Sequence, residues 1–240
     1  MMSVLVCRPE DDGIFLAKSL AKQNITSFVL PTISIENISV NINTDVFTDL
    51  IFTSKYAVKN FFSQYSPSFF SNTSIYAVGA STASLIEGFG LQCKHPLKYD
   101  SYNLLELIKT VSTSDKQFAI VAGVGGNAYL VDELSKIASC QKLEVYKRSR
   151  ISEKELLKSY SKHYQNTAPD IIVVTSIDIF RSLNRIFCKI LAPYDSKITV
   201  TSSKMLELVK DSGFKNIVKL ELLNNDYICE VIEKIIRGNE

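Results

Sequence analysis

Two blocks of this sequence occur twice, at nearly the same spacing. Residues 50–58 (LIFTSKYAV) resemble residues 172–180 (IVVTSIDIF), because in both an apolar run ends in Thr-Ser. Residues 78–85 (VGASTASL) resemble residues 201–208 (TSSKMLEL). The offset is 122 residues in the first pair and 123 residues in the second. Two matched blocks at nearly the same offset predict two similar lobes rather than one long sheet.

Short β-branched runs alternate with amphipathic stretches along the whole chain. Such alternation predicts βαβ units, and therefore an α/β fold with parallel sheets. The run 171–174 is apolar at every position, as expected of a strand covered on both faces. The expected strands are 4–7, 27–30, 49–53, 75–78, 118–121, 171–175, 198–201 and 217–220, and the clearest expected helices are 10–23, 178–190, 204–211 and 226–237.

The division into lobes follows from counting strands. Residues 1–33 supply only two strands, so a five-stranded flavodoxin-like sheet needs strands from elsewhere in the chain. We therefore expect one discontinuous lobe (1–33 with 150–240), one continuous lobe (40–142) and two linker strands (34–39 and 143–149). The alternative is one domain over 1–142 and a smaller one over 150–240.

Composition excludes several classes of protein. Lys and Arg number 27 against 25 Asp and Glu, which is no basic excess of the kind that nucleic-acid binding uses. No apolar run approaches the roughly 18 residues of a membrane span, and no secretory signal is visible. Five cysteines, odd in number and far apart, are typical of free, mostly buried thiols in a reducing compartment. We expect a cytoplasmic protein that binds neither nucleic acid nor membrane.

Five loops share one pattern, in which a strand is followed by glycine or hydroxylated residues and then by a helix. In a parallel sheet such loops lie at the carboxyl ends of the strands, where helix N-termini can bind anions without net charge. Ser and Thr before a helix also serve as N-caps, and for any single loop capping alone is the leading interpretation. Five loops on two lobes nevertheless favour a ligand role for the following residues: Ser54, Gly79, Ser81, Thr82, Gly123, Gly125, Gly126, Ser176, Ser202 and Ser203.

Other chemistries lack their motifs. The glycines of 123–126 are followed by no Gly-Lys-Ser/Thr and lack dinucleotide-binding spacing, no Cys or His pair has zinc spacing, and no nucleophile elbow is present. Tyr146 lies in an expected crossing between lobes, where its phenol could act as a hydrogen-bond donor or general acid, or could pack the hinge strand. Arg8 ends the first strand and faces either an anion or solvent.

Taken together, these segments resemble the uroporphyrinogen-III synthase family over nearly the whole chain. The residues 78–85 match its V-G-x-x-T-A block, which is its most specific segment, and the order and spacing of the others agree. The other matching segments are 4–9 (VLVCRP), Pro31, 50–58, 101–105 (SYNLL), 123–126 (GVGG), 145–146 (VY) and 174–176 (VTS).

The resemblance implies two flavodoxin-like lobes joined by a two-stranded linker, with the active site in the cleft between them. Family members close linear hydroxymethylbilane into uroporphyrinogen III, inverting the last pyrrole ring and losing water, without cofactor or metal. Tyr146 matches the tyrosine thought to assist hydroxyl departure, and Ser54, Thr82, Ser176 and Ser202 match cleft positions. We therefore expect a monomeric lyase with a small-molecule substrate.

This chain departs from the family on either side of the glycine segment and at the start of the second-lobe helix, where it has residues 203–205 (SKM). Many relatives have arginine before and after the glycine segment, where this chain has Ala122 and Asn127. Lys98, Lys204 and Lys55 are candidates to bind substrate carboxylates in their place. The alternative function is a two-lobed, non-catalytic binding module for a small polyanion.

Overall fold

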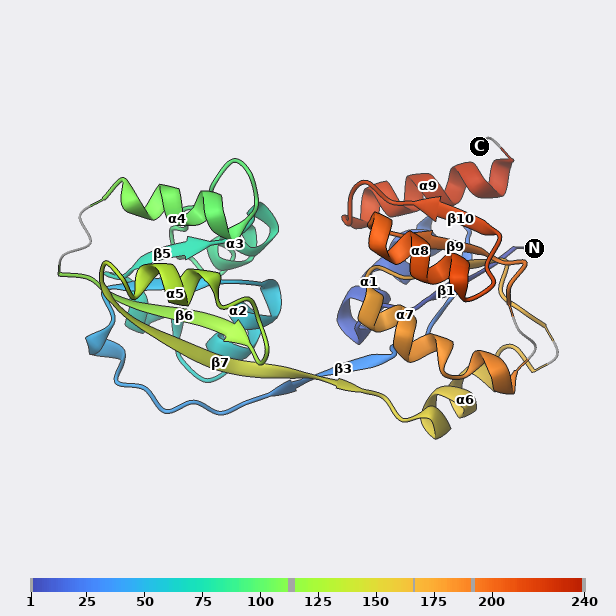
Figure 1. Cartoon of the computed structure of the whole chain (residues 1–240), viewed down its shortest axis with the longest axis horizontal. Coiled ribbons are helices and arrows are strands. Elements are labelled where there is room, and N and C mark those ends of the chain that lie inside the picture. Colours follow the sequence, from blue (N-terminus) through green and yellow to red (C-terminus); the bar gives the residue numbers. More distant parts are fainter. Residues whose placement is uncertain (1, 112–114, 166, 191–192, 239–240) are drawn as a thin grey trace. The chain divides into compact units, whose positions relative to one another are not determined.

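The computed structural model describes residues 2–111, 115–165, 167–190 and 193–238. Its internal contacts divide it into two compact units, one of Met1–Ser34 with Ser149–Glu240 and one of Ile35–Arg148 (Figure 1). Both units are α/β. Within the described residues, no helix has the length and apolar character needed to span a bilayer.

The first unit contains a five-stranded parallel sheet assembled from both ends of the chain. Its strand order is β2-β1-β8-β9-β10, and every neighbouring pair is parallel. Numbered within the unit, this is the 2-1-3-4-5 order of flavodoxin-like folds. The strands are β1 (Ser3–Val6), β2 (Thr26–Val29), β8 (Ile171–Val173), β9 (Lys197–Val200) and β10 (Asn216–Lys219).

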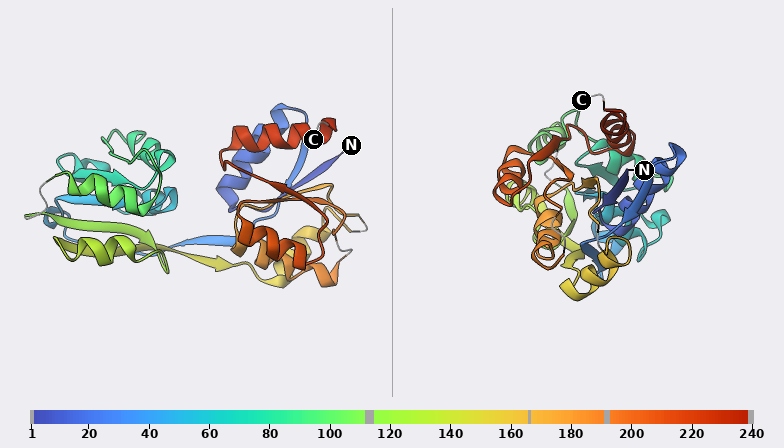
Figure 2. Two further views of the ribbon diagram at one scale, coloured as in Figure 1. Left: turned by 45° about the horizontal axis from the view of Figure 1, so that its top comes forward. Right: turned by 90° about the vertical axis from the view of Figure 1, so that its right-hand side faces the viewer.

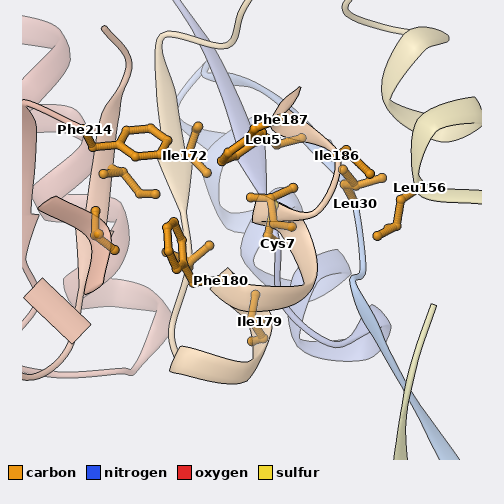
Figure 3. Close-up of a cluster of buried hydrophobic side chains, with 14 of the residues drawn as sticks. Leu5, Cys7, Leu30, Leu156, Ile172, Ile179, Phe180, Ile186, Phe187 and Phe214 are labelled. Carbon is orange, nitrogen blue, oxygen red and sulfur yellow. The ribbon is translucent and has the colours of Figure 1, made fainter. Parts of the chain in front are cut away.

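Both faces of this sheet are covered by helices, which explains the apolar, buried residues of its central strands β1 and β8. Helices α1 (Glu10–Lys22) and α9 (Asn225–Arg237) pack on one face through Leu16 and Ile232. On the other face, α6 (Glu153–Ser161), α7 (Ile177–Asn184) and α8 (Ser203–Asp211) enclose a larger core. Figure 3 shows this core, with Leu5 and Ile172 from the sheet beside Phe180 and Phe187.

Four strands of the second unit repeat this plan, and β3 takes the place of the fifth. Its strand order is β5-β4-β6-β7-β3, and β5, β4, β6 and β7 run parallel. Helices cover both sides of each sheet (Figure 2). The strands are β3 (Ile33–Asn37), β4 (Asp49–Phe52), β5 (Ser74–Ala77), β6 (Gln117–Gly123) and β7 (Ser139–Arg150). The helices are α2 (Lys55–Phe62) and α3 (Ala80–Glu87) on one face and α4 (Ser101–Lys109) and α5 (Tyr129–Leu134) on the other.

Strand β7 is 12 residues long and pairs with two different strands. Its first part lies parallel to β6. Its later part meets β3 in the opposite direction, since Ile38 N–H donates to Val145 O (2.9 Å) and Ile151 N–H donates to Thr32 O (3.1 Å). The expected linker strand began at residue 143, whereas β7 begins at Ser139 because residues 139–144 complete the parallel sheet.

Short elements account for most other differences from the expected helices and strands. The helix expected over 178–190 ends at Asn184 and is followed by a 3₁₀ turn, η3 (Phe187–Lys189). Two further turns, η1 (Thr44–Val46) and η2 (Pro67–Phe70), precede β4 and β5. The sequence interpretation did not include α6, although Ser152 and Glu155 form the reciprocal capping box of an S-x-x-E motif at its start.

The cysteines are free, as expected, but they are less buried than expected. Cys7 and Cys229 are buried, Cys93 and Cys140 are half-buried and Cys188 is exposed. Burial raises the pKa of the Cys93 thiol to about 12 and that of Cys140 to about 11. These thiols are therefore poor nucleophiles at neutral pH.

Candidate functional site

A cavity of about 250 Å³ lies at the carboxyl ends of the central strands of the second unit. Its walls come from the loops after β4, β5 and β6, from the later part of β7 and from the start of α4. Ligands of open α/β sheets bind at this end of the strands. The lining residues are Thr53, Ser54, Val78, Ser101, Ala122, Gly123, Val124, Gly125, Gly126, Asn127, Leu130, Tyr146 and Arg148.

Two hydroxyl groups meet at the wall of this cavity. The phenol oxygen of Tyr146 lies 3.1 Å from Oγ of Ser54, within hydrogen-bond distance. Ser54 is also the N-cap of α2, and its Oγ accepts the backbone N–H of Ala57 at 3.1 Å. Tyr146 is only 4% exposed, and its ring packs 5.9 Å from that of Tyr56. Tyr146 therefore packs against its neighbours and also lines the cavity. Its role as a hydrogen-bond donor or general acid stays a prediction.

Gly123 makes room for the Tyr146 ring. A Cβ at residue 123 would lie 2.5 Å from Cζ and 2.9 Å from the phenol oxygen, closer than real Cβ atoms approach. The β6–β7 register shifts after Ala122, so that Gly123 stands opposite Tyr146. Such irregularities redirect side chains. Gly125 has a φ of +71°, in the left-handed region that favours glycine. The glycine segment is thus needed for close packing and for a turn.

The other predicted residues of the second unit belong to the neighbouring loop. Gly79 is the N-cap of α3, with the Tyr99 side chain against it, Ser81 is exposed and Thr82 is buried. They do not line the cavity, although Val78 does. The structure therefore brings Ser54, the three glycines and Tyr146 together, and leaves the 79–82 group beside them.

In the first unit, the predicted serines lie at the starts of helices. Ser176 caps α7 by accepting the Ile179 N–H (3.3 Å), and Ser202 caps α8 by accepting the Met205 N–H (3.2 Å). Ser203 is the exposed first residue of α8. The capping interpretation therefore holds for Ser176 and Ser202, as it does for Ser54. Their binding roles stay predictions.

Arg8 is buried at the end of β1, with 7% of its surface exposed, so it does not face solvent. Its Nη1 donates to Asn225 Oδ1 at 2.7 Å, and its Nη2 lies 3.9 Å from an Asp12 carboxylate oxygen. This guanidinium ties the β1–α1 loop to the start of α9. The predicted substrate contact of Arg8 remains untested.

Sequence reasoning missed Arg148, which lines the cavity together with Tyr146. A signal was present, because residues two apart on a strand point to the same face. Ser101, the first residue of α4, also lines the cavity. The sequence analysis named it only within the 101–105 motif and not as a site residue. No group of three potential metal ligands occurs among the residues that the structure describes.

Fold and site together define a protein of two flavodoxin-like α/β units with a hydroxyl-bearing cavity at strand carboxyl ends. The family model described as uroporphyrinogen-III synthase HemD matches residues 15–220, and the chain belongs to this family. The resemblance seen in the sequence motifs is confirmed, and the non-catalytic binding module is not favoured.

Two solved structures agree with this fold. Uroporphyrinogen-III synthetase from Helicobacter pylori is 13% identical with a TM-score of 0.67, over 98% of this chain and 100% of that chain. A mutant uroporphyrinogen III synthase from Thermus thermophilus is 13% identical with a TM-score of 0.57, over 99% of this chain and 100% of that chain. A comparison with curated protein sequences finds no match.

Proposed function

We propose that the chain closes linear hydroxymethylbilane into uroporphyrinogen III, inverting the last pyrrole ring and releasing water. This makes it a cyclising lyase, which we place in the cytoplasm as a monomer acting on a small molecule. The family match over residues 15–220 carries the proposal. The hydroxyl pair of Tyr146 and Ser54 supplies a chemical group suited to the reaction.

The pair can present one hydroxyl proton to a departing group. Ser54 Oγ already accepts the Ala57 N–H, and each hydroxyl has one proton. If Ser54 donates to Tyr146, the phenol proton is free to point elsewhere; if Tyr146 donates to Ser54, the serine proton is free. In either arrangement one O–H donor remains for a ligand in the cavity.

This donor matches the bond-breaking step. When the terminal C–O bond of the bilane breaks, both electrons leave on oxygen, and the pyrrole nitrogen stabilises the carbocation. A proton from the hydroxyl pair converts the departing hydroxide to water, which is general acid catalysis. Inversion of the last ring then requires two C–C bonds to form and one to break. The carbocation bonds to the carbon of the last ring that already carries a bridge, and the older bridge bond breaks to give a second carbocation. This second carbocation bonds to the unsubstituted carbon of the same ring, whose proton returns to the hydroxyl pair. The net change is loss of one water molecule.

Positioning of the substrate is the other part of the task. The bilane is flexible, and ring closure requires that its terminal carbons meet in the correct ring order. Holding reacting groups in such a geometry lowers the entropic cost of reaction. Rigid elements support this cavity, since β4, β6 and β7 are neighbours in one sheet.

The test is to add the chain to freshly generated hydroxymethylbilane and to identify the uroporphyrinogen isomer after oxidation and chromatography. Spontaneous closure gives the type I isomer, so type III above the protein-free control supports the proposal. Type I product alone, from a folded chain, would reject it.

A further inference from the structure

We propose that Arg148 binds a carboxylate side chain of the pyrrole ring that occupies the cavity of the second unit. This inference rests on the proposed function, because that function supplies a ligand with both an aromatic ring and carboxylates. It assigns one specific cation to a cavity whose other lining residues are uncharged.

The first observation is the charge of the cavity wall. Among the described residues that line it, Arg148 is the only one with a full charge. The remaining polar groups are hydroxyls, the amide of Asn127 and the backbone of the glycine segment. No lining carboxylate competes for the guanidinium, so a bound anion meets attraction without an opposing charge.

The second observation is the contrast with the two lysines of β7; Arg150, the remaining cation of this strand, does not line the cavity. Lys142 pairs with Glu144 at 2.7 Å, and Lys147 pairs with Glu36 at 2.9 Å. Arg148 is exposed, and in the described parts of the chain its guanidinium has no carboxylate within 4.0 Å. Side chains alternate along a strand, so Tyr146 and Arg148 line the cavity while Lys147 does not.

The third observation is the match between the cavity and one substituted ring. At about 250 Å³ it is smaller than the roughly 300–1,000 Å³ of pockets that enclose a drug-sized ligand, so it suits part of a tetrapyrrole. Val78, Ala122 and Leu130 offer apolar surface to a flat ring. Arginine binds carboxylates through two parallel N–H donors, which fixes the orientation of the ring as well as its charge.

The inference also assigns a cation different from those suggested by the sequence. Lys98, Lys204 and Lys55 were candidates, but none of them lines the cavity. Ala122 and Asn127 do line it, on either side of the glycines. Arg148 reaches the same space from strand β7.

The experiment compares Arg148→Gln with Lys147→Gln, a neighbouring variant with the same change in net charge on the other face of β7. Initial rates of uroporphyrinogen III formation are measured over a range of hydroxymethylbilane concentrations and at two salt concentrations. We expect Arg148→Gln to raise KM about tenfold, equivalent to about 1.4 kcal/mol, with kcat within twofold. Lys147→Gln should change neither, and Arg148→Lys should give an intermediate KM. The KM of wild type should also rise more with salt than that of Arg148→Gln.

The outcomes separate the two proposals. If wild type forms type III product and Arg148→Gln keeps the wild-type KM, the role of Arg148 is wrong while the proposed function stands. An equal rise of KM in Lys147→Gln would also overturn the role of Arg148. The rise would then follow from the loss of one positive charge anywhere on this part of β7, and not from a contact made by Arg148. If Arg148→Gln does not fold, as judged by circular dichroism, the KM of Arg148→Lys decides, since loss of the bidentate contact should raise it at least threefold. If wild type forms only type I, the proposed function fails first.

Discussion

Gly123 and Tyr146 stand opposite each other on β6 and β7, so close that a Cβ at residue 123 would lie 2.5 Å from Cζ of the tyrosine ring. This contact fixes where the phenol oxygen lies, 3.1 Å from Ser54 Oγ. Because Gly123 has no side chain, the Tyr146 ring can lie against it with the phenol beside Ser54.

Replacing Gly123 with alanine should displace the Tyr146 ring and break its bond to Ser54. We expect kcat to fall at least tenfold, with a smaller effect on KM. In the Tyr146→Phe background the same replacement should cost little further kcat, because residues that act as a unit are not additive. Steady-state kinetics of the two single variants and the double variant measure this coupling, and additive losses would contradict it.

Replacing Tyr146 with phenylalanine should remove the proton donor and keep the ring. General acid catalysis contributes about 10²–10⁴-fold, so we expect kcat to fall about a hundredfold or more. The fold should persist, since the ring still fills the space beside Gly123. Kinetics together with circular dichroism check this, and an unchanged kcat would remove Tyr146 from the mechanism.

Replacing Ser54 with alanine should reduce both stability and turnover. It removes the N-cap of α2, at a cost of about 1 kcal/mol, and leaves Tyr146 without its hydroxyl partner. Ser152→Ala is the matched control, because it removes a serine cap from α6 outside the cavity. We expect both variants to unfold at lower urea concentration, but only Ser54→Ala to lose kcat. Equal kcat in both would mean that Ser54 serves only as a cap.

Tyr160 offers a test of stability that is independent of the site. Its hydroxyl is buried and has no hydrogen-bond partner among the described residues, and burial raises its pKa above the ordinary value of 10.0. The Tyr160 phenol therefore ionises at a lower pH in the unfolded chain than in the folded chain. As a result, the folded state loses stability as the pH rises above about 10.

Tyr160→Phe should thus be at least as stable as wild type at pH 7 and should lose less stability at pH 10.5. Tyr65→Phe is the contrast, because the Tyr65 hydroxyl donates to Val40 O (2.6 Å) and accepts the Ile42 N–H (3.1 Å). Its loss should cost about 1 kcal/mol at pH 7. Urea unfolding at the two pH values gives these free energies, and a destabilised Tyr160→Phe at pH 7 would show that its hydroxyl has a partner.

The repeated blocks were sufficient to predict the architecture. The alternation of apolar runs with amphipathic stretches is a local pattern, and it predicts the α/β class. Residues 1–33 supply too few strands for a full sheet, so strands from the later part of the chain were expected to complete it. In the structure, strand β1 lies between β2 and β8. The predicted cleft between lobes remains a prediction.

The site was less accessible to sequence reasoning, because its details depend on packing between distant residues. The glycines at 123, 125 and 126 suggested a ligand loop, whereas Gly123 is needed for the Tyr146 ring. The tyrosine's serine partner is 92 positions away, and no local pattern indicates that contact. Arg148 was overlooked because its only signal was strand alternation after Tyr146.

The most direct measurement is the isomer composition of uroporphyrinogen formed from hydroxymethylbilane as the concentration of the chain is increased. The account predicts that the type III fraction rises from the protein-free background toward the whole product, and that Tyr146→Phe shifts this rise to far higher concentrations. A type III fraction that stays at background at every concentration of folded wild-type chain would contradict it.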